Sequence, residues 1–210
     1  MTDWYRRKSW TKDDEKEFFL KLNRARKDSR AKYLRIQAVE LIETRNNYLL
    51  DIAEALLNRI LIEYPESKFE WGLSLYSLGE IFIQKEDFEK SIQYFKQAID
   101  FEKDYPKVKT NAYLIFSELV VKTGKVDLFI LVENIILDRF SKLLFPIDLY
   151  KAASILSIIS HYKKDFEKAK YYSNLADQNA DLNISGLRYH KYLGIVKERD
   201  LILDKLVKRK

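Results

Sequence analysis

The sequence contains no cysteine. Disulfide bonds, thiolate metal sites and cysteine nucleophiles are therefore excluded. Only five glycines and three prolines are spread over 210 residues, which is too few turn residues for a fold made of many short strands. The scarcity of chain breakers, together with long runs of mixed charged and apolar residues, predicts an all-α protein.

Long apolar segments are missing as well. No run approaches the roughly 18 apolar residues that identify a membrane-spanning helix, and the first residues lack the apolar core of a signal peptide. Hydrophobic residues make up 47% of the chain and aromatic residues 14%, which argues against intrinsic disorder. We therefore expect a soluble cytoplasmic protein with no membrane partner, a compartment that the absence of cysteine permits.

Sequence signatures of catalysis are also absent. His161 and His190 are the only histidines, and neither has a further metal ligand at a suitable spacing. The patterns of serine nucleophiles, P-loops, zincins and dinucleotide-binding sites do not occur. We expect a protein that is not an enzyme and that uses no metal or cofactor.

The positive charge is concentrated at one end of the chain. The formal net charge is +6, and residues 1–35 account for all of it, with twelve Lys and Arg against six Asp and Glu. Within this region the stretch WYRRKSW (residues 4–10) interleaves aromatic and basic side chains. One interpretation is that the rings stack on nucleic-acid bases while the cations contact phosphates. We favour the other, in which the rings cap the first helices and the cations stay in solvent.

The sequence also repeats itself. The stretch KEDFEKSIQYF (residues 85–95) recurs in similar form as KKDFEKAKYYS (residues 163–173), 78 residues later. Small residues recur in register at Gly79, Ser117, Ser157 and Gly194, spaced by 38, 40 and 37 residues. Phe88, Val126 and Phe166 are predicted to open the second helix of successive repeats. Repetition at this period predicts two-helix units, in which small residues allow the helices to approach closely.

Residues 71–106, WGLSLYSLGEIFIQKEDFEKSIQYFKQAIDFEKDYP, resemble the tetratricopeptide repeat (TPR). Leu78, Gly79 and Phe82 fit its first helix, Ala98 its second, and Pro106 the proline that follows. The stretch departs from the pattern at Leu75 (for Trp), Glu86 (for the turn Gly) and Ser91 (for Ala). The stretch KYLRIQA (residues 32–38) also resembles the opening of small bacterial TPR proteins. The resemblance implies an α-α superhelix, a solenoid of about four helical hairpins with an N-terminal helix and a C-terminal capping helix.

These patterns divide the chain into two regions. A basic N-terminal cap with one helix is expected at residues 1–30, and the capping box Thr11–Asp14 opens that helix. A TPR-like domain is expected at residues 31–210, with repeats at about 31–66, 70–106, 107–143 and 146–181 and capping helices at 185–208.

The TPR resemblance also implies which residues line a concave groove. Carried over position by position, these are Lys32, Arg35, Tyr76, Glu80, Gln84, Asn111, Glu118, Lys122, Lys151, His161, Tyr162, Arg188 and Lys191. None of the ninth repeat positions is the Asn with which some TPR domains clamp a terminal carboxylate. The mixed charge of the set suits a protein or peptide partner of mixed charge, although solvated surface side chains would give the same pattern.

The expected function is a non-catalytic protein-protein interaction module or scaffold that binds a protein or peptide partner in this groove. Three alternatives stay open. The chain could be a bacterial immunity or antitoxin-like protein that occludes a toxin, a nucleic-acid-binding protein that uses its basic N-terminus, or a homo-oligomeric scaffold.

Overall fold

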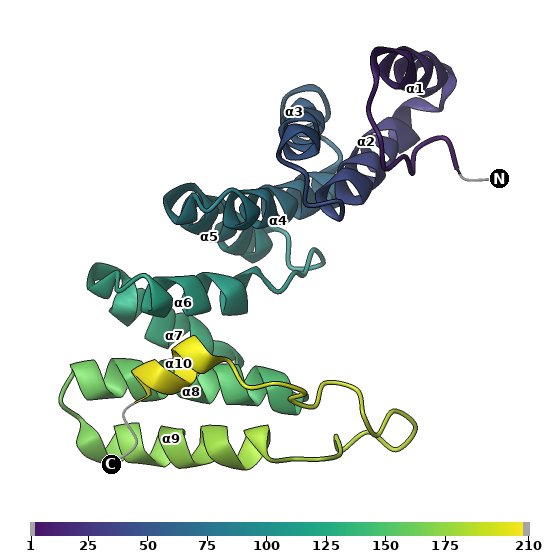
Figure 1. The fold of residues 1–210 in the computed structure, drawn as a ribbon. Helices are drawn as coiled ribbons and strands as arrows, with labels where there is room; N and C mark the ends of the chain where they lie inside the picture. The colour runs from purple at the N-terminus through teal and green to yellow at the C-terminus, as the bar shows by residue number, and fades with distance from the viewer. Residues whose placement is uncertain (1–2, 208–210) are drawn as a thin grey trace. The chain divides into compact units, whose positions relative to one another are not determined.

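A computed structural model describes residues 3–207, and this part of the chain folds into helices and loops with no strand. The all-α prediction is confirmed. The helices are α1 (Lys12–Arg24), α2 (Lys27–Ile42), α3 (Asn47–Glu63), α4 (Lys68–Gln84), α5 (Phe88–Asp104), α6 (Ala112–Lys122), the 3₁₀ turn η1 (Val126–Leu128), α7 (Phe129–Phe140), α8 (Pro146–Tyr162), α9 (Phe166–Ala180) and α10 (Leu201–Leu206). From α2 to α9, successive helices pack as antiparallel pairs (Figure 1).

The chain forms two compact units, Met1–Ala112 and Tyr113–Lys210, here called the N-terminal and the C-terminal unit. The N-terminal unit contains α1 and the pairs α2/α3 and α4/α5; the C-terminal unit contains most of α6, then α7, the pair α8/α9 and α10. The boundary expected near residue 30 remains a prediction. Across residues 3–207, no helix combines the length and the apolar character that crossing a membrane requires.

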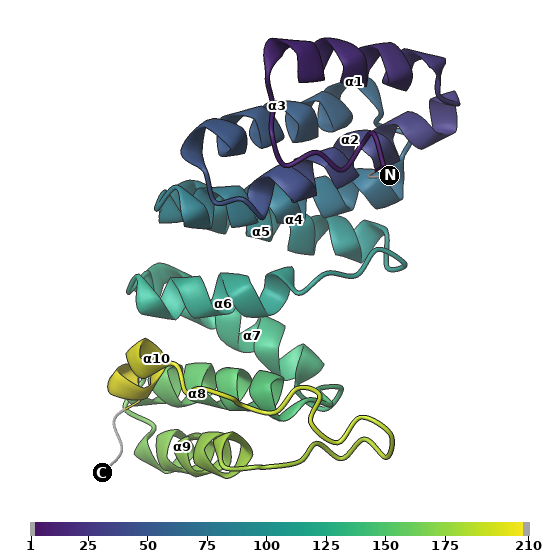
Figure 2. The same ribbon diagram turned by 45° about the vertical axis from the view of Figure 1, so that its right-hand side comes forward.

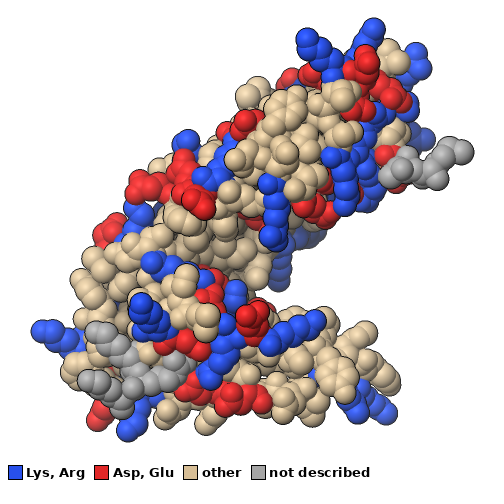
Figure 3. All heavy atoms as spheres, in the orientation of Figure 1, with Lys and Arg blue, Asp and Glu red and all other residues tan. Residues whose placement is uncertain are grey.

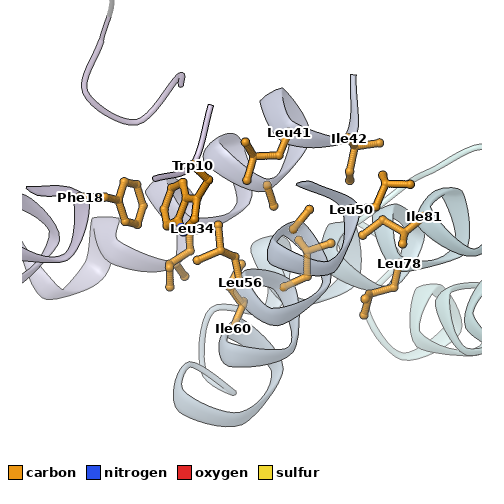
Figure 4. Packing of buried hydrophobic residues seen from close by; sticks show 14 of the residues in the cluster. Trp10, Phe18, Leu34, Leu41, Ile42, Leu50, Leu56, Ile60, Leu78 and Ile81 are labelled. Carbon is orange, nitrogen blue, oxygen red and sulfur yellow. The ribbon is translucent and has the colours of Figure 1, made fainter. Parts of the chain in front are cut away.

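The core of the N-terminal unit begins ahead of the helix pairs. Trp10 and Phe18 are buried in one hydrophobic cluster with residues of α2, α3 and α4 (Figure 4). The predicted capping box is present: the Thr11 hydroxyl accepts the Asp14 amide at 3.1 Å, and the Asp14 carboxylate accepts the Thr11 amide at 2.9 Å. The hydrogen bond from the Thr11 backbone, more than any other contact, lowers the pKa of Asp14 to about 2.

The near-identical stretches open equivalent helices, as predicted. Asp87 precedes α5 and Asp165 precedes α9, and each side chain accepts the amide three residues on, of Lys90 or Lys168, at 3.1 Å. The prediction that Val126 opens the corresponding helix is wrong by one turn. Residues 126–128 form a 3₁₀ turn, closed by a hydrogen bond from the Leu128 amide to the Lys125 carbonyl, and α7 begins at Phe129.

Two of the four small residues, Gly79 and Ser157, lie at contacts between paired helices, whereas Gly194 lies in a turn outside any helix. A Cβ at Gly79 on α4 would come within 2.7 Å of the Phe95 ring on α5. At the same place the Ser91 hydroxyl donates to the Gly79 carbonyl at 2.9 Å. The residues 78 positions later repeat the contact with the donor reversed, since the Ser157 hydroxyl of α8 donates to the Ala169 carbonyl of α9 at 2.8 Å. The two pairs therefore share one packing register.

The turn within each helix pair contains one residue in the left-handed region. These residues are Arg45, Glu86, Gly124 and Lys164, with φ of 55°, 59°, 68° and 63°. The departure from the TPR pattern at Glu86 thus keeps the backbone conformation that the turn glycine provides.

The substitution Glu86→Gly should raise the free energy of unfolding by about 0.5–1 kcal/mol. Removing the side chain from the left-handed region relieves about 1–2 kcal/mol, but glycine loses more conformational entropy on folding, which offsets part of the gain. Gly124→Ala should lower it by about 1 kcal/mol. No heavy atom lies within 4 Å of a Cβ at Gly124, so this loss reports the backbone alone. Urea unfolding of both variants checks the pair, and a loss of stability in Glu86→Gly contradicts it.

The predicted capping helices at 185–208 are largely wrong. Residues 182–200 contain no helix, α10 covers only Leu201–Leu206, and residue 208 lies outside the described residues. The amide and the hydroxyl of Ser185 donate to the carbonyls of Lys191 and His190 at 2.6 and 2.8 Å and so close a loop. Gly194 adds a positive φ of 74°. These contacts satisfy the backbone without a helix.

Candidate interaction surfaces

In the N-terminal unit, the first helix of each pair is α2 or α4. These two helices contain five of the predicted groove residues. Arg35 on α2 donates from Nε to Oε2 of Glu70 on α4 at 2.5 Å, while Lys32 is exposed. Arg35 therefore joins two helices of this unit, a role that the sequence pattern did not show.

Three predicted residues form a row on α4. Tyr76, Glu80 and Gln84 follow one another at four-residue spacing, so they lie on the same side of the helix, and all three are partly buried. We call them the α4 row. Gln84 also lines an open pocket of about 530 Å³ with Asn47, Asp51, Lys85 and Glu86.

In the part of the chain that the structure describes, the α4 row contains a carboxylate with no paired cation and an amide oxygen with no hydrogen-bond donor. Burial raises the pKa of Glu80, and the neighbouring Tyr76 hydroxyl only opposes that shift. Burial, and next the charge of Glu80, likewise raise the pKa of Tyr76. Within residues 3–207 no lysine or arginine pairs with Glu80, and the buried Gln84 Oε1 has no hydrogen-bond partner. Polar groups in this state gain from a donor supplied by a ligand.

The N-terminal segment lies along α2. The Arg7 amide donates to Oε1 of Gln37 at 3.0 Å, and Gln37 Nε2 donates to the Arg7 carbonyl at 2.7 Å. Arg6 pairs with Glu40 at 2.6 Å. Because Gln37 is fully buried, this two-way bond fixes the segment against the helix.

The aromatic residues of the same segment pack inward. The ring of Trp4 lies 5.3 Å from Phe18 and 5.1 Å from Tyr33, and the ring of Trp10 lies 5.2 Å from Phe18. The ring of Tyr5 lies 4.7 Å from that of Tyr33, tilted by 37°. The rings therefore pack against aromatic residues of α1 and α2.

In the C-terminal unit, three predicted residues meet in one ion network. Glu118 on α6 accepts Nζ of Lys122 at 2.5 Å and Nζ of Lys151 on α8 at 2.8 Å. Lys122 also contacts Oδ2 of Asp200, directly before α10, at 2.5 Å. Burial acts to lower the pKa of Lys122, but its hydrogen bonds with Asp200 and Glu118 outweigh burial, so the pKa is raised. These side chains bind one another and α10.

The remaining predicted residues lie elsewhere. His161 and Tyr162, at the end of α8, pack on Phe166 and Phe129 with ring centroids 5.3 and 5.1 Å apart. Asn111 is exposed just before α6. Arg188 and Lys191 were assigned to a terminal helix and are instead exposed in the Ser185-closed loop, where the Arg188 guanidinium lies 5.3 Å from the centre of the Tyr189 ring.

Sequence reasoning missed Tyr150 and Asp200. Asp200 directly precedes the apolar Leu-Ile-Leu of α10, a helix-start signal in the sequence. Nothing local identifies Tyr150, because its partners lie 50 and 54 residues along the chain.

The described residues contain no group of three or more His, Asp or Glu side chains arranged to hold a metal ion. Comparison with known proteins gave no match: no protein-family model, no curated protein and no solved structure matches this chain.

Proposed function

We propose that the chain is a non-catalytic, TPR-like solenoid module that binds a protein or peptide partner through the first-helix face of its N-terminal unit. The observation that carries this proposal is the α4 row. Its carboxylate is partly buried without a cation, and the amide oxygen one turn further is buried without a donor.

The chemistry of the row specifies the partner's contribution. A lysine or arginine side chain of the partner would neutralise Glu80 and donate to its carboxylate, and hydrogen bonds to charged groups contribute about 1.5–3 kcal/mol each. The ring of Tyr76, held at 5.6 Å from Phe95 in a T-shaped contact, offers a rigid apolar surface beside the carboxylate. Tyrosines of this kind are frequent among the residues that dominate binding energy.

Two observations support the solenoid architecture. The turns of four successive pairs place a left-handed residue at the same point, and two pairs share a hydroxyl-carbonyl contact 78 residues apart. Units that repeat in this way stack on their neighbours and present their first helices on one side.

Nucleic-acid binding through the N-terminus has less support. Two of the cations in the WYRRKSW stretch already have partners, since Arg6 pairs with Glu40 and Arg7 pairs with Asp14 and Glu17. Over α1 and the N-terminal segment, Figure 3 shows acidic and basic side chains side by side rather than a surface of one sign. An immunity or antitoxin role would use the same surface as the proposed module, with a toxin as its partner.

Reversing the charge of Glu80 in the α4 row should weaken partner binding. Glu80→Lys places a cation against the partner's cation, so the partner's affinity should fall at least about tenfold, which corresponds to one lost charged hydrogen bond. The measurement is affinity capture with the full chain from the source organism, followed by titration of the purified partner.

Asp104→Lys is the matched control, because it changes the charge equally on an exposed residue at the end of the second helix α5. Capture that survives Glu80→Lys but is lost in Asp104→Lys would overturn the proposal.

A further inference from the structure

In the C-terminal unit the short helix α10 lies on α8, the first helix of the pair α8/α9. Helix α10 packs against α8 in both ribbon views (Figures 1 and 2). Its Leu203 and the following Val207 are buried, whereas Leu201 and Ile202 are 79% and 57% exposed. Helix α10 is therefore an amphipathic helix with one face docked.

Polar groups of α6 and α8 bind the N-cap of α10 and a residue near its middle. Tyr150, 1% exposed on α8, donates from its hydroxyl to Oδ1 of Asp204 at 2.9 Å and accepts the Asp200 amide at 3.0 Å. Lys122 on α6 binds the Asp200 side chain at 2.5 Å. Burial, and next the bond to Asp204, raise the pKa of Tyr150 to about 12, so the hydroxyl stays a donor. We call Lys122, Tyr150 and the apolar surface under Leu203 the α10 seat.

The contact between α10 and α8 is of a kind that can open reversibly. A helix of six residues is too short to be stable without its docking surface. It follows a helix-free segment of 19 residues, 182–200, whose last part is tied to α9 by Arg199, which pairs with Asp177. Among residues 3–207, the attachment of α10 combines the two buried apolar side chains with the hydrogen bonds of Tyr150 and with partly exposed ion pairs, and such local contacts open at lower free energy than a core helix.

We propose that the α10 seat is a binding site for an acid-capped amphipathic helix of a partner protein, and that α10 is the internal ligand which this helix replaces. The inference rests on the proposed interaction function. It specifies the ligand: Asp at the N-cap, an apolar residue three positions on, a second Asp at four and an apolar residue at seven, as in Asp200, Leu203, Asp204 and Val207. Because α10 is tethered, its effective concentration at the seat is about a millimolar. The partner's helix must therefore compete with α10 for the seat.

The test uses the full chain with α10 undocked by Asp200→Lys and Leu203→Glu, both outside the seat. The probe is a labelled peptide of residues 198–207. The peptide should bind the undocked variant at least about tenfold more tightly than the wild type, because the internal competitor is removed. A peptide with both aspartates replaced by lysine should not bind, and Lys122→Glu in the undocked chain should weaken binding. Equal affinity for wild type and variant, or binding to neither, overturns the proposal.

Hydrogen exchange of the wild-type chain provides an independent measurement that needs no variant. The Asp204 and Val207 amides, bonded within α10 to the carbonyls of Asp200 and Leu203, should exchange by local opening, at least about tenfold faster than the amides of α8. Exchange of these amides only through global unfolding would contradict a displaceable α10. Because Glu80 lies in the N-terminal unit, Glu80→Lys should leave peptide binding unchanged, so this proposal and the proposed function fail separately.

Discussion

Phe95→Ala should lower the free energy of unfolding by about 3–5 kcal/mol, the range for removing a fully buried aromatic side chain. Phe95 is completely buried, and its ring fills the space that Gly79 leaves open on α4, with the closest ring atoms 2.7 Å from where a Cβ would lie. The cavity would lie between α4 and α5, where close helix approach leaves little freedom to collapse. Urea unfolding followed by circular dichroism measures the loss.

Phe88→Ala is the matched control for that substitution. Phe88 begins the same helix but is 40% exposed, so its removal should cost less than about 1 kcal/mol. Equal losses in the two variants would show that the α4/α5 contact does not hold this unit together.

Trp10→Ala should have an effect of similar size, about 3–5 kcal/mol. Trp10 is 5% exposed and lies edge-on to Phe18 in the cluster that joins α1 to α2 and α3. The neighbouring Lys8→Ala should change stability by less than about 0.5 kcal/mol, because Lys8 is exposed and its ion pair with Glu43, at 3.4 Å, lies at the surface. Thermal and urea unfolding check both variants.

The Trp10→Ala variant also distinguishes the two interpretations of the stretch WYRRKSW. If Trp10→Ala leaves stability unchanged and reduces binding of labelled RNA, the ring acts as a nucleic-acid platform and the cap interpretation is wrong. If stability falls while RNA binding stays weak and insensitive to the substitution, the packing role accounts for the residue.

Most of the helices could be predicted because local and periodic signals in the sequence specify them. The capping box at Thr11 and the aspartate before each of Phe88 and Phe166 mark helix starts within four residues of sequence. The helix-free segment 182–200 could not be predicted in this way. Its shape depends on the bonds of Ser185 to carbonyls five and six residues on, a contact with no periodicity.

The candidate site was predictable in part for the same reason. Four-residue spacing alone places Tyr76, Glu80 and Gln84 on one side of α4. In contrast, Lys122 and Asp200 meet across 78 residues, and Arg35 reaches Glu70 across 35. A single sequence does not show which charges meet at such distances, so it could not indicate that α10 lies beside Lys122.

Site-specific photo-crosslinking tests the central claim, that a first-helix face binds another protein, most directly. A photoreactive phenylalanine derivative replaces Tyr76 on α4 in one chain and the exposed Tyr171 on the second helix α9 in another, and each is irradiated in cells of the source organism. The account predicts one defined protein adduct from position 76, lost on Glu80→Lys, and none from position 171. An adduct from position 171 alone, or one from position 76 that persists in Glu80→Lys, would contradict it.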